Sequence, residues 1–382
     1  MGNIESYLKW RGDIPFTLDG LNEIDNLVFC TLVYFDMAES LSESKTAQLS
    51  DICAKVRSSG ENAVRNVSLD ISAYMSFLDS IEGSSRFGNV IVSDYVDVYD
   101  VDKQTQFAAC VFHISDSKGY IAFRGTDDTL IGWKEDFMIS FTKTEAQELA
   151  LAYAKKHLSP GKRWYMGGHS KGGNELLYAA ALLPDDCWNT VDRIFLLDGP
   201  GLCPEVMSLD GMQRVDSKTT RVIPSFSVIG KLFEPRITDT RIIRSSAIGI
   251  QQHGLSTWGI DHGRLALAED NDPTSKWISE TLDLWIGSIT QEERPVFVNE
   301  LFDALSAGGA TTLNQLDKEG REGLEAVLKQ FGSSSELTRK TISELPKQAF
   351  RVGLNQLRQH LEDGMQELEN KIAASEEEIR KS

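Results

Sequence analysis

Residues 162–183 read KRWYMGGHSKGGNELLYAAALL, and this stretch decides the fold. Its first part is a short segment typical of a strand, and its second part has the leucine and alanine content of a helix that Pro184 ends. Between them, Ser170 stands in the pattern G-x-S-x-G. A serine on a tight turn between strand and helix predicts a nucleophile. The alternative is a glycine-rich helix start that only caps or binds an anion.

Helix and strand patterns alternate around this stretch. Thr144 and Gln147 form a capping-box pattern that predicts a helix at residues 144–158, and strands are expected at residues 192–198 and 219–226. Strand, helix and strand in succession predict parallel strands joined by right-handed crossovers. The carboxyl ends of such strands are where an active site is expected.

Three regions are expected along the chain. Residues 1–85 carry helical patterns, residues 86–265 carry the strands, and residues 266–382 are helical and charged. Short β-branched and aromatic runs at residues 88–128 predict an antiparallel meander at the start of the sheet. The last ~25 residues are expected to form an exposed helix, which is a candidate surface for a protein partner.

Composition limits the classes of function. The chain of 382 residues has a formal charge of −18, which disfavours nucleic acid and anionic membranes because their phosphates would be repelled. No apolar run approaches the ~18 residues of a membrane helix, and the start of the chain lacks a signal-peptide core, so a cytoplasmic location is expected. Its cysteines and histidines are scattered singly, which predicts no disulfide framework, no metal site and no cofactor.

A second stretch brings a resemblance. Residues 120–137 read YIAFRGTDDTLIGWKEDF, and FRGT followed by GHSKGG at residues 168–173 resembles the class 3 (fungal-type) lipases. The resemblance implies that Thr126 and the backbone N–H of Lys171 form an oxyanion hole. It also implies that residues 129–137 occupy the place of the lipase lid.

The resemblance narrows with four further motifs. These are YLKWRGDIPF at 7–16, NEIDNL at 22–27, DGPG at 198–201 and GIQQHGLSTW at 249–258, and they look like those of an uncharacterised bacterial family of lipase-like α/β-hydrolases. The likeness extends to about residue 330. It implies an α/β-hydrolase fold, with a mostly parallel central sheet, an antiparallel edge, flanking helices and helical additions at both ends.

A serine nucleophile needs an imidazole to take its proton and a carboxylate to orient that imidazole. His253, His262 and His360 lie downstream of Ser170, where the fold is expected to place the histidine. We favour His253, because it stands in a glycine-bounded loop beside Trp258 and carries the stronger family match. His262 is the alternative, and His360 is expected on a helix surface.

Class 3 lipases place the acid of the triad after a strand that corresponds here to residues 221–230. That segment offers Ser225 and Ser227 but no carboxylate. Asp198, at the end of the preceding strand, is our candidate, since some α/β-hydrolases such as pancreatic lipase carry the acid there. Asp198 in a turn-forming role is the alternative. The other candidate acids are Asp128, Glu234, Asp239 and Asp261.

These residues predict a serine hydrolase of the lipase or esterase type that cleaves a carboxylic ester, either a small molecule or an acyl lipid. Ser170, His253 and Asp198 would form its triad. A Ser-Lys mechanism is disfavoured, because the Lys171 side chain leaves the turn directly after the serine and is expected to point away. Two alternatives stay open: transfer of the acyl group to an alcohol or thiol, and a catalytically inactive scaffold that binds a partner.

Overall fold

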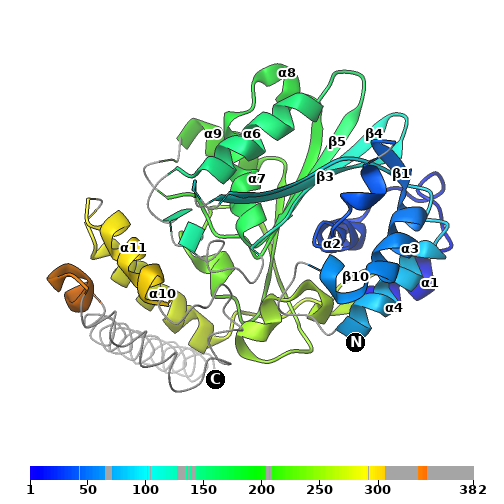
Figure 1. Ribbon diagram of the computed structural model, residues 1–382. Helices are drawn as coiled ribbons and strands as arrows, with labels where there is room; N and C mark the ends of the chain where they lie inside the picture. Colours follow the sequence, from blue (N-terminus) through cyan, green and yellow to red (C-terminus); the bar gives the residue numbers. More distant parts are fainter. Residues whose placement is uncertain are drawn as a thin grey trace, which may run out of the picture.

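The computed structural model is described here for residues 1–42, 44–64, 71–100, 102–103, 105–126, 134–135, 138–139, 143–203, 206, 209–290, 292–305 and 334–341. Figure 1 shows a twisted central sheet with one group of helices on each face. A further pair of helices lies to one side, below the sheet in this view.

One eight-stranded sheet organises the chain. Its strands follow one another in chain order from β1 to β8. Those from β1 to β4 pair antiparallel, and those from β4 to β8 pair parallel. The strands are β1 (Thr46–Gln48), β2 (Ile91–Asp100), β3 (Thr105–Ser115), β4 (Lys118–Phe123), β5 (Arg163–His169), β6 (Val191–Leu197), β7 (Thr219–Pro224) and β8 (Asp239–Ile243). This confirms the predicted meander, the parallel crossovers and the α/β-hydrolase fold.

Helices from the first part of the chain pack on one face of the sheet, and later helices pack on the other (Figure 1). The first group comprises α1 (Ile4–Arg11), α2 (Glu23–Leu32), α3 (Leu49–Ser59) and α4 (Ile71–Glu82), and the second α6 (Glu145–His157), α7 (Lys171–Leu182), α8 (Asp185–Trp188) and α9 (Leu209–Asp216). The predicted capping box of Thr144 and Gln147 opens α6. Both groups bury apolar side chains against the sheet, and this makes two cores.

Helix α2 differs from the other N-terminal helices because residues 24–32 are buried all round. The sequence predicts one apolar face there, with Ile24, Leu27 and Val28 on it. The helix lies between the sheet and the outer helices and contacts β4, β5 and α1, so both of its faces are covered. This burial brings the end of α2, and the turn that follows it, close to the carboxyl edge of the sheet.

Several 3-10 helices, a two-stranded hairpin and two further helices complete the described fold. Strand β8 and the hairpin that β9 and β10 form were not expected from the sequence. The remaining elements are η1 (Glu39–Leu41), η2 (Gly60–Ala63), η3 (Ile229–Lys231), η4 (Gly249–His253), η5 (Leu255–Thr257), β9 (Ile260–Asp261), β10 (Arg264–Leu265), α10 (Pro273–Gly287) and α11 (Arg294–Leu305). Helix α10 contacts η3, and Asp283 on α10 accepts a hydrogen bond from the Phe233 N–H at 3.4 Å.

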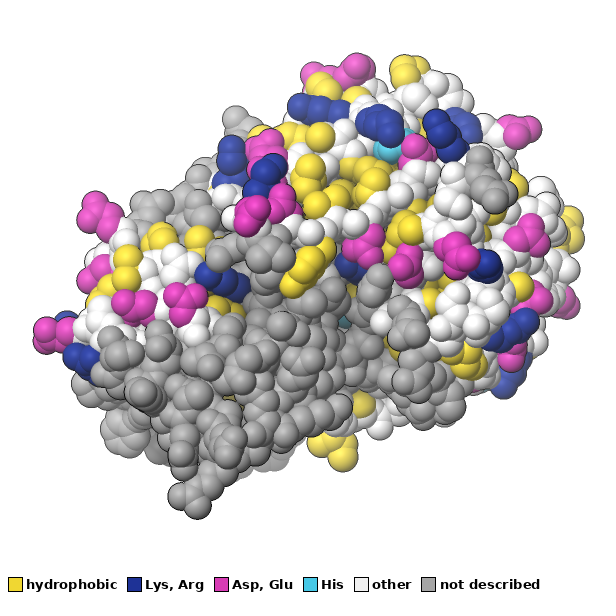
Figure 2. All heavy atoms as spheres, in the orientation of Figure 1, with side chains coloured by type: hydrophobic (Ala, Val, Ile, Leu, Met, Phe, Trp, Pro, Cys, Tyr) yellow, Lys and Arg dark blue, Asp and Glu magenta, His cyan; other side chains and the backbone are white. Residues whose placement is uncertain are grey.

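The division into three regions stays a prediction. Strand β1, from the first region, pairs with β2 of the second, so these two regions share one sheet. The expected exposed helix at the end of the chain lies outside the described residues. Figure 2 shows acidic and basic side chains intermixed over the upper part of the visible face, with apolar side chains between them. In the described part of the chain, no helix has the length and apolar composition to cross a membrane.

Candidate active site

Ser170 occupies the sharp turn between β5 and α7. Its φ is 57° and its ψ is −130°, a conformation that a residue with a side chain adopts only under strain. The turn is closed by contacts that only glycine permits: a Cβ at Gly168 would strike the backbone of Gly172, and a Cβ at Gly172 would strike that of Phe123. The sequence predicted this strand, turn and helix, and Ser170 lies at the junction.

Asp198 and His253 meet at the same edge of the sheet. Asp198 follows β6, and its Oδ2 lies 2.6 Å from Nδ1 of His253, which ends η4. The carboxylate is sealed, with 1% of its side chain exposed, whereas 22% of the imidazole is exposed. Since the carboxylate accepts from Nδ1–H, Nε2 of His253 carries the free lone pair.

Two neighbours hold Asp198 in place. The buried hydroxyl of Ser227 donates to the other carboxylate oxygen, Oδ1, at 2.5 Å. Gly230 packs so closely that a Cβ there would strike Oδ1. Ser227 belongs to the segment in which class 3 lipases are expected to carry the acid. Here that segment supplies a hydrogen bond to the acid instead of the acid itself.

The loop that carries His253 is fixed by the residue before it. Gln252 Oε1 accepts from the N–H of Phe226 and from the hydroxyl of Ser225, both at 3.1 Å. The indole N–H of the fully buried Trp258 donates to the Gln252 carbonyl at 2.9 Å. These bonds tie the loop to the segment after β7, so the position of His253 is set by packing and not by chain connectivity alone.

Of the expected oxyanion residues, Lys171 directly follows Ser170 in the chain, and Thr126 follows a glycine that packs on Ser170. Thr126 follows β4, and its neighbour Gly125 approaches Ser170 so closely that a Cβ at Gly125 would lie 2.8 Å from the Ser170 Cβ. Lys171 is the first residue of α7, and N–H donors and the positive end of the helix dipole lie at this end of a helix. A developing negative charge next to Ser170 would gain from such donors.

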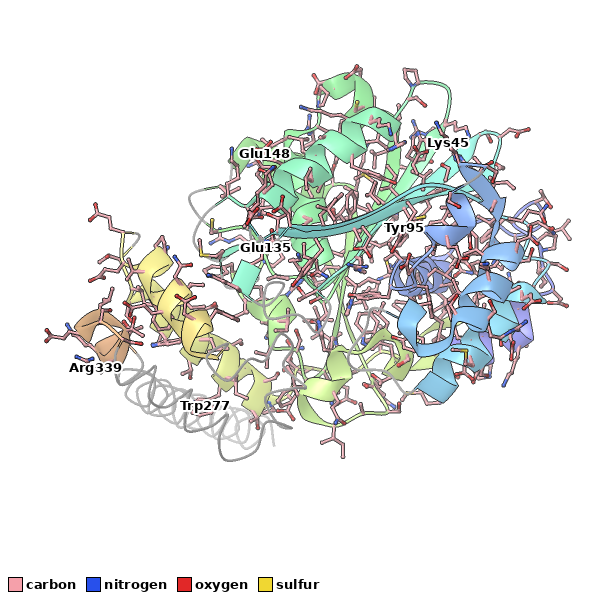
Figure 3. All side chains as sticks on the ribbon, in the orientation of Figure 1. Lys45, Tyr95, Glu135, Glu148, Trp277 and Arg339 are labelled. Atoms are coloured by element: carbon pink, nitrogen blue, oxygen red, sulfur yellow. The ribbon has the colours of Figure 1, made fainter. Side chains whose placement is uncertain are left out.

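The Lys171 side chain is committed elsewhere. Its ammonium is buried, donates to the Gln106 carbonyl and to Oε2 of Glu135 at 2.8 Å, and lies 3.5 Å from Oε1 of Glu175. Glu135, which is labelled in Figure 3, also accepts from the N–H of Gln106 at 2.9 Å, at the start of β3. A lysine held by two carboxylates has no lone pair to offer, which disfavours a Ser-Lys mechanism.

The alternative residues lie away from this cluster or outside the described residues. The imidazole of His262 is 94% exposed and lies 2.6 Å from Asp261 in the turn between β9 and β10. Glu234 pairs with Arg221, and Asp239 pairs with Arg241. The residues outside the described part are Asp128, His360 and most of the segment expected in the place of the lid.

Among the described residues, Ser170 and His253 are not hydrogen-bonded to each other. Contacts of this kind are often long in unliganded enzymes and tighten when substrate binds. The cluster therefore contains a formed acid–imidazole pair and a separate, strained serine. The site assignment of Ser170, His253, Asp198, Thr126 and Lys171 stays a prediction.

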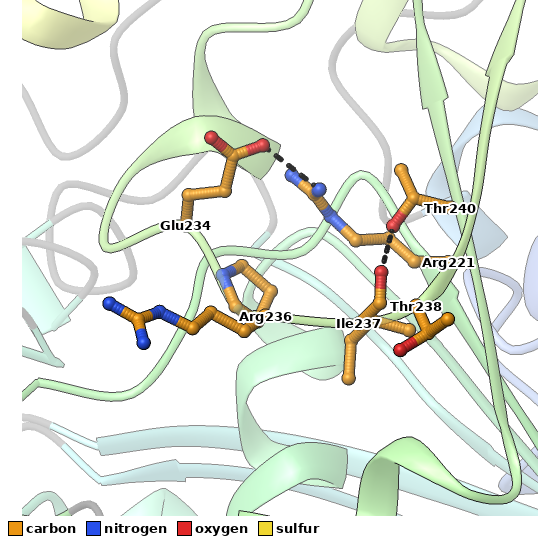
Figure 4. Close-up of a pocket in the computed structure, with 7 residues that line it drawn as sticks. Arg221, Glu234, Arg236, Ile237, Thr238 and Thr240 are labelled. Carbon is orange, nitrogen blue, oxygen red and sulfur yellow. Dashed lines mark hydrogen bonds and ion pairs between the residues drawn. The ribbon is translucent and has the colours of Figure 1, made fainter.

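A pocket of about 530 Å³ lies next to this site but does not include it (Figure 4). Its lining comes from β7, β8 and the segment between them: Arg221, Glu234, Pro235, Arg236, Ile237, Thr238 and Thr240. Arg221 connects the pocket to the site, because it donates to the Gly230 carbonyl at 2.7 Å and Gly230 packs on Asp198. The described residues contain no group of three or more histidine, cysteine or carboxylate side chains that could hold a metal ion.

Sequence reasoning missed two residues that contact the cluster. Ser227 was noted only for not being an acid, and its bond to Asp198 depends on two strands packing side by side. Tyr34, in the turn after α2, hydrogen-bonds Gly125 and His169, which lie more than 90 residues further along the chain. No local signal in the sequence around Tyr34 indicates this contact.

The parallel sheet, the strained serine at a strand–helix junction and the acid–imidazole pair at the carboxyl edge define an architecture of the α/β-hydrolase type. The chain matches the Mbeg1-like family over residues 81–303, more than half of its length, and belongs to that family. Among solved structures it is similar to the crystal structure of M37 lipase, with 15% identity over 55% of this chain and 69% of that one, and a TM-score of 0.32. So distant a likeness says nothing about activity. No curated protein is similar enough to count as a relative. A bacterial source stays a prediction.

Proposed function

We propose that the protein is a serine hydrolase of the esterase or lipase type that acts on a carboxylic ester. The observation that supports this most is the 2.6 Å contact between Asp198 and His253 at the edge of the sheet where Ser170 stands in strained backbone. A hydrogen-bonded carboxylate, an imidazole with a free Nε2 and a serine on an elbow are the groups that acyl transfer requires.

The reaction proceeds in two halves. The Ser170 Oγ attacks the ester carbonyl carbon while His253 Nε2 takes the hydroxyl proton, and the carbonyl electrons move onto oxygen, which Thr126 and the Lys171 N–H stabilise. The C–O bond to the alcohol then breaks, and Nε2 returns the proton to the leaving oxygen. Water repeats the sequence on the acyl-enzyme and releases the acid and Ser170. Asp198 stays ionised and stabilises the imidazolium throughout.

The substrate is either a small-molecule ester or an acyl lipid, and the location that we propose is the cytoplasm. Delivery of the acyl group to an alcohol or thiol in place of water uses the same residues. The inactive scaffold is the second candidate function, because Ser170 lacks a hydrogen bond to His253 among the described residues.

Covalent labelling of the full chain with a fluorophosphonate, followed by intact mass, tests the proposal. We expect a single adduct on the wild type, none on Ser170→Ala, and much slower labelling of His253→Ala. Ser279→Ala is the control, because it removes another serine hydroxyl from a described helix, α10, that carries none of the candidate site residues. Folded wild type that takes no adduct, or an adduct that survives in Ser170→Ala, would favour the scaffold.

A further inference from the structure

A chain of three hydrogen bonds runs beneath the candidate site and joins segments far apart in the sequence. The Gly125 N–H lies 3.1 Å from the Tyr34 hydroxyl, and that hydroxyl lies 2.8 Å from Nδ1 of His169. Nε2 of His169 lies 2.9 Å from the carbonyl oxygen of His253. The mechanism above uses neither Tyr34 nor His169.

The direction of each bond follows from the donors. The His253 carbonyl can only accept, so Nε2 of His169 carries a hydrogen. Burial, helped by the nearby charge of His253, lowers the pKa of His169 well below its usual 6.5, so the ring is neutral and Nδ1 is an acceptor. Tyr34 therefore donates to His169 and accepts from Gly125. Of the two neutral tautomers of His169, only the one with hydrogen on Nε2 satisfies all three bonds.

The two ends of this chain are backbone groups in the two halves of the site. At one end is the segment of Gly125 and Thr126, which we call the oxyanion loop. At the other end are residues 249–253, which we call the histidine loop. The centre is His169, next to Ser170, and its ring lies 4.5 Å from the His253 ring, measured between centroids. A shift of either loop would stretch a bond of the chain.

We propose that Tyr34 and His169 are positioning residues that hold the oxyanion loop and the histidine loop at a fixed separation around Ser170. The inference rests on the proposed function for its consequence in catalysis, but the link between the loops can be measured without any reaction. The N-terminal helices thereby contribute to the site, since Tyr34 follows α2. Small displacements of reacting groups cost large factors in rate, so a link that fixes both loops would matter for the reaction.

Three variants divide the chain of bonds. Tyr34→Phe removes the hydroxyl and leaves Gly125 and His169 without that partner. His169→Asn keeps an acceptor near Nδ1 for Tyr34 but loses the donor to His253. His169→Gln places an amide N–H near Nε2, so it keeps the donor to His253. Tyr7→Phe is the matched control: Tyr7 is 2% exposed like Tyr34, and its hydroxyl likewise donates one bond, to Asp25, and accepts one, from Asn22.

Two measurements are made on the full-length protein. The first is the fluorophosphonate labelling rate, where we expect Tyr34→Phe and His169→Asn to be slower than wild type by about 10- to 100-fold. His169→Gln is expected to lose less than His169→Asn. The second is amide hydrogen exchange, where Tyr34→Phe should speed exchange in the peptide that contains Gly125 and also in the peptide that contains residues 249–258. His169→Asn should affect the second peptide most, and Tyr7→Phe neither.

Wild-type labelling and wild-type exchange in Tyr34→Phe and His169→Asn would overturn the proposal. So would equal effects in Tyr7→Phe, because general loss of stability would then explain them. Wild type that takes no label, together with faster exchange in both loops of Tyr34→Phe, would refute the proposed function and still support the link between the loops. Failure of the two proposals is therefore distinguishable.

Discussion

Two buried carboxylates in this protein have opposite surroundings. Asp25, among the N-terminal helices, faces the guanidinium of Arg86, and both side chains are 0% exposed. Asp198, at the carboxyl edge of the sheet, faces the imidazole of His253, which is 22% exposed. The first pair is closed to solvent, and the second is partly exposed on the side of the imidazole.

The closed pair has every donor occupied. Arg86 donates to both oxygens of Asp25 and to the carbonyls of Ile14, Asp19 and Gly20, which uses all five of its N–H groups. Its guanidinium also lies over the Phe16 ring, 4.1 Å from the centroid. An arginine that never loses its proton and has no spare donor stabilises structure.

The open pair has one nitrogen without a structural task. His253 uses Nδ1 for Asp198, and no hydrogen bond to another described residue uses its Nε2. The comparison shows how the surroundings of a carboxylate within the N-terminal helices differ from those of the carboxylate that we propose for the triad. The first has an arginine partner with every donor in use, and the second a histidine partner with one ring nitrogen not used in a hydrogen bond among the described residues.

The largest effect that follows concerns Asp198. Asp198→Asn keeps the shape of the side chain but removes the charge that stabilises an imidazolium and selects the His253 tautomer. We expect the labelling rate to fall by about 10³- to 10⁴-fold while the protein stays folded. The fluorophosphonate rate and the midpoint of thermal unfolding check this. A labelling rate within about tenfold of wild type would remove Asp198 from the triad and end the contrast between the two carboxylates.

The second-largest expected effect concerns Asp25, and it is a loss of stability without a loss of labelling. Asp25→Asn leaves the Arg86 charge buried without its counter-ion, so we expect a loss of about 3–5 kcal/mol in the free energy of unfolding. Molecules that remain folded should still label at the wild-type rate. Urea unfolding followed by tryptophan fluorescence measures the stability. A midpoint equal to that of wild type would mean that the sealed pair contributes nothing to the fold.

The smallest effect is a dependence of stability on pH that comes from His169. Burial lowers its pKa in the folded state, so below pH 6.5 the unfolded chain binds a proton that the folded chain does not. The free energy of unfolding therefore falls as pH falls below 6.5, by at most about 1.4 kcal/mol per pH unit from this residue. The Arg86–Asp25 pair contributes no such slope in this range from its guanidinium, which does not titrate.

His169→Gln removes the group that titrates, so the difference between wild type and this variant measures the contribution of His169 to the pH dependence of stability. Unfolding of wild type and variant at pH 7 and pH 5 should show that the wild type loses more stability on acidification. Asp283, whose pKa burial raises to about 6, acts in the opposite sense because its folded form takes up the proton more readily. Asp283 is present in both proteins, so its contribution cancels in the difference. Parallel pH curves for the two proteins would show that His169 is not held neutral by the fold.

Short-range signals carried much of the fold. The capping box of Thr144 and Gln147, the stop at Pro184 and the glycines around Ser170 each act within a few residues, so the sequence predicts their structures directly. The burial of α2 on all faces was missed, because it depends on elements that pack on α2 from elsewhere in the chain. Strand β8 was missed as well, since its place in the sheet is set by pairing with β7.

The sequence by itself determined the elbow, the alternation of strand and helix on either side of it, and a short set of candidate residues, because these depend on backbone conformations that neighbouring residues impose. Only the tertiary structure decided which candidates meet. It brought Asp198 to His253, placed the Ser227 hydroxyl against the Asp198 carboxylate, and brought the Tyr34 hydroxyl against His169. Contacts between segments tens of residues apart are fixed by how buried surfaces pack, and no local pattern encodes that packing.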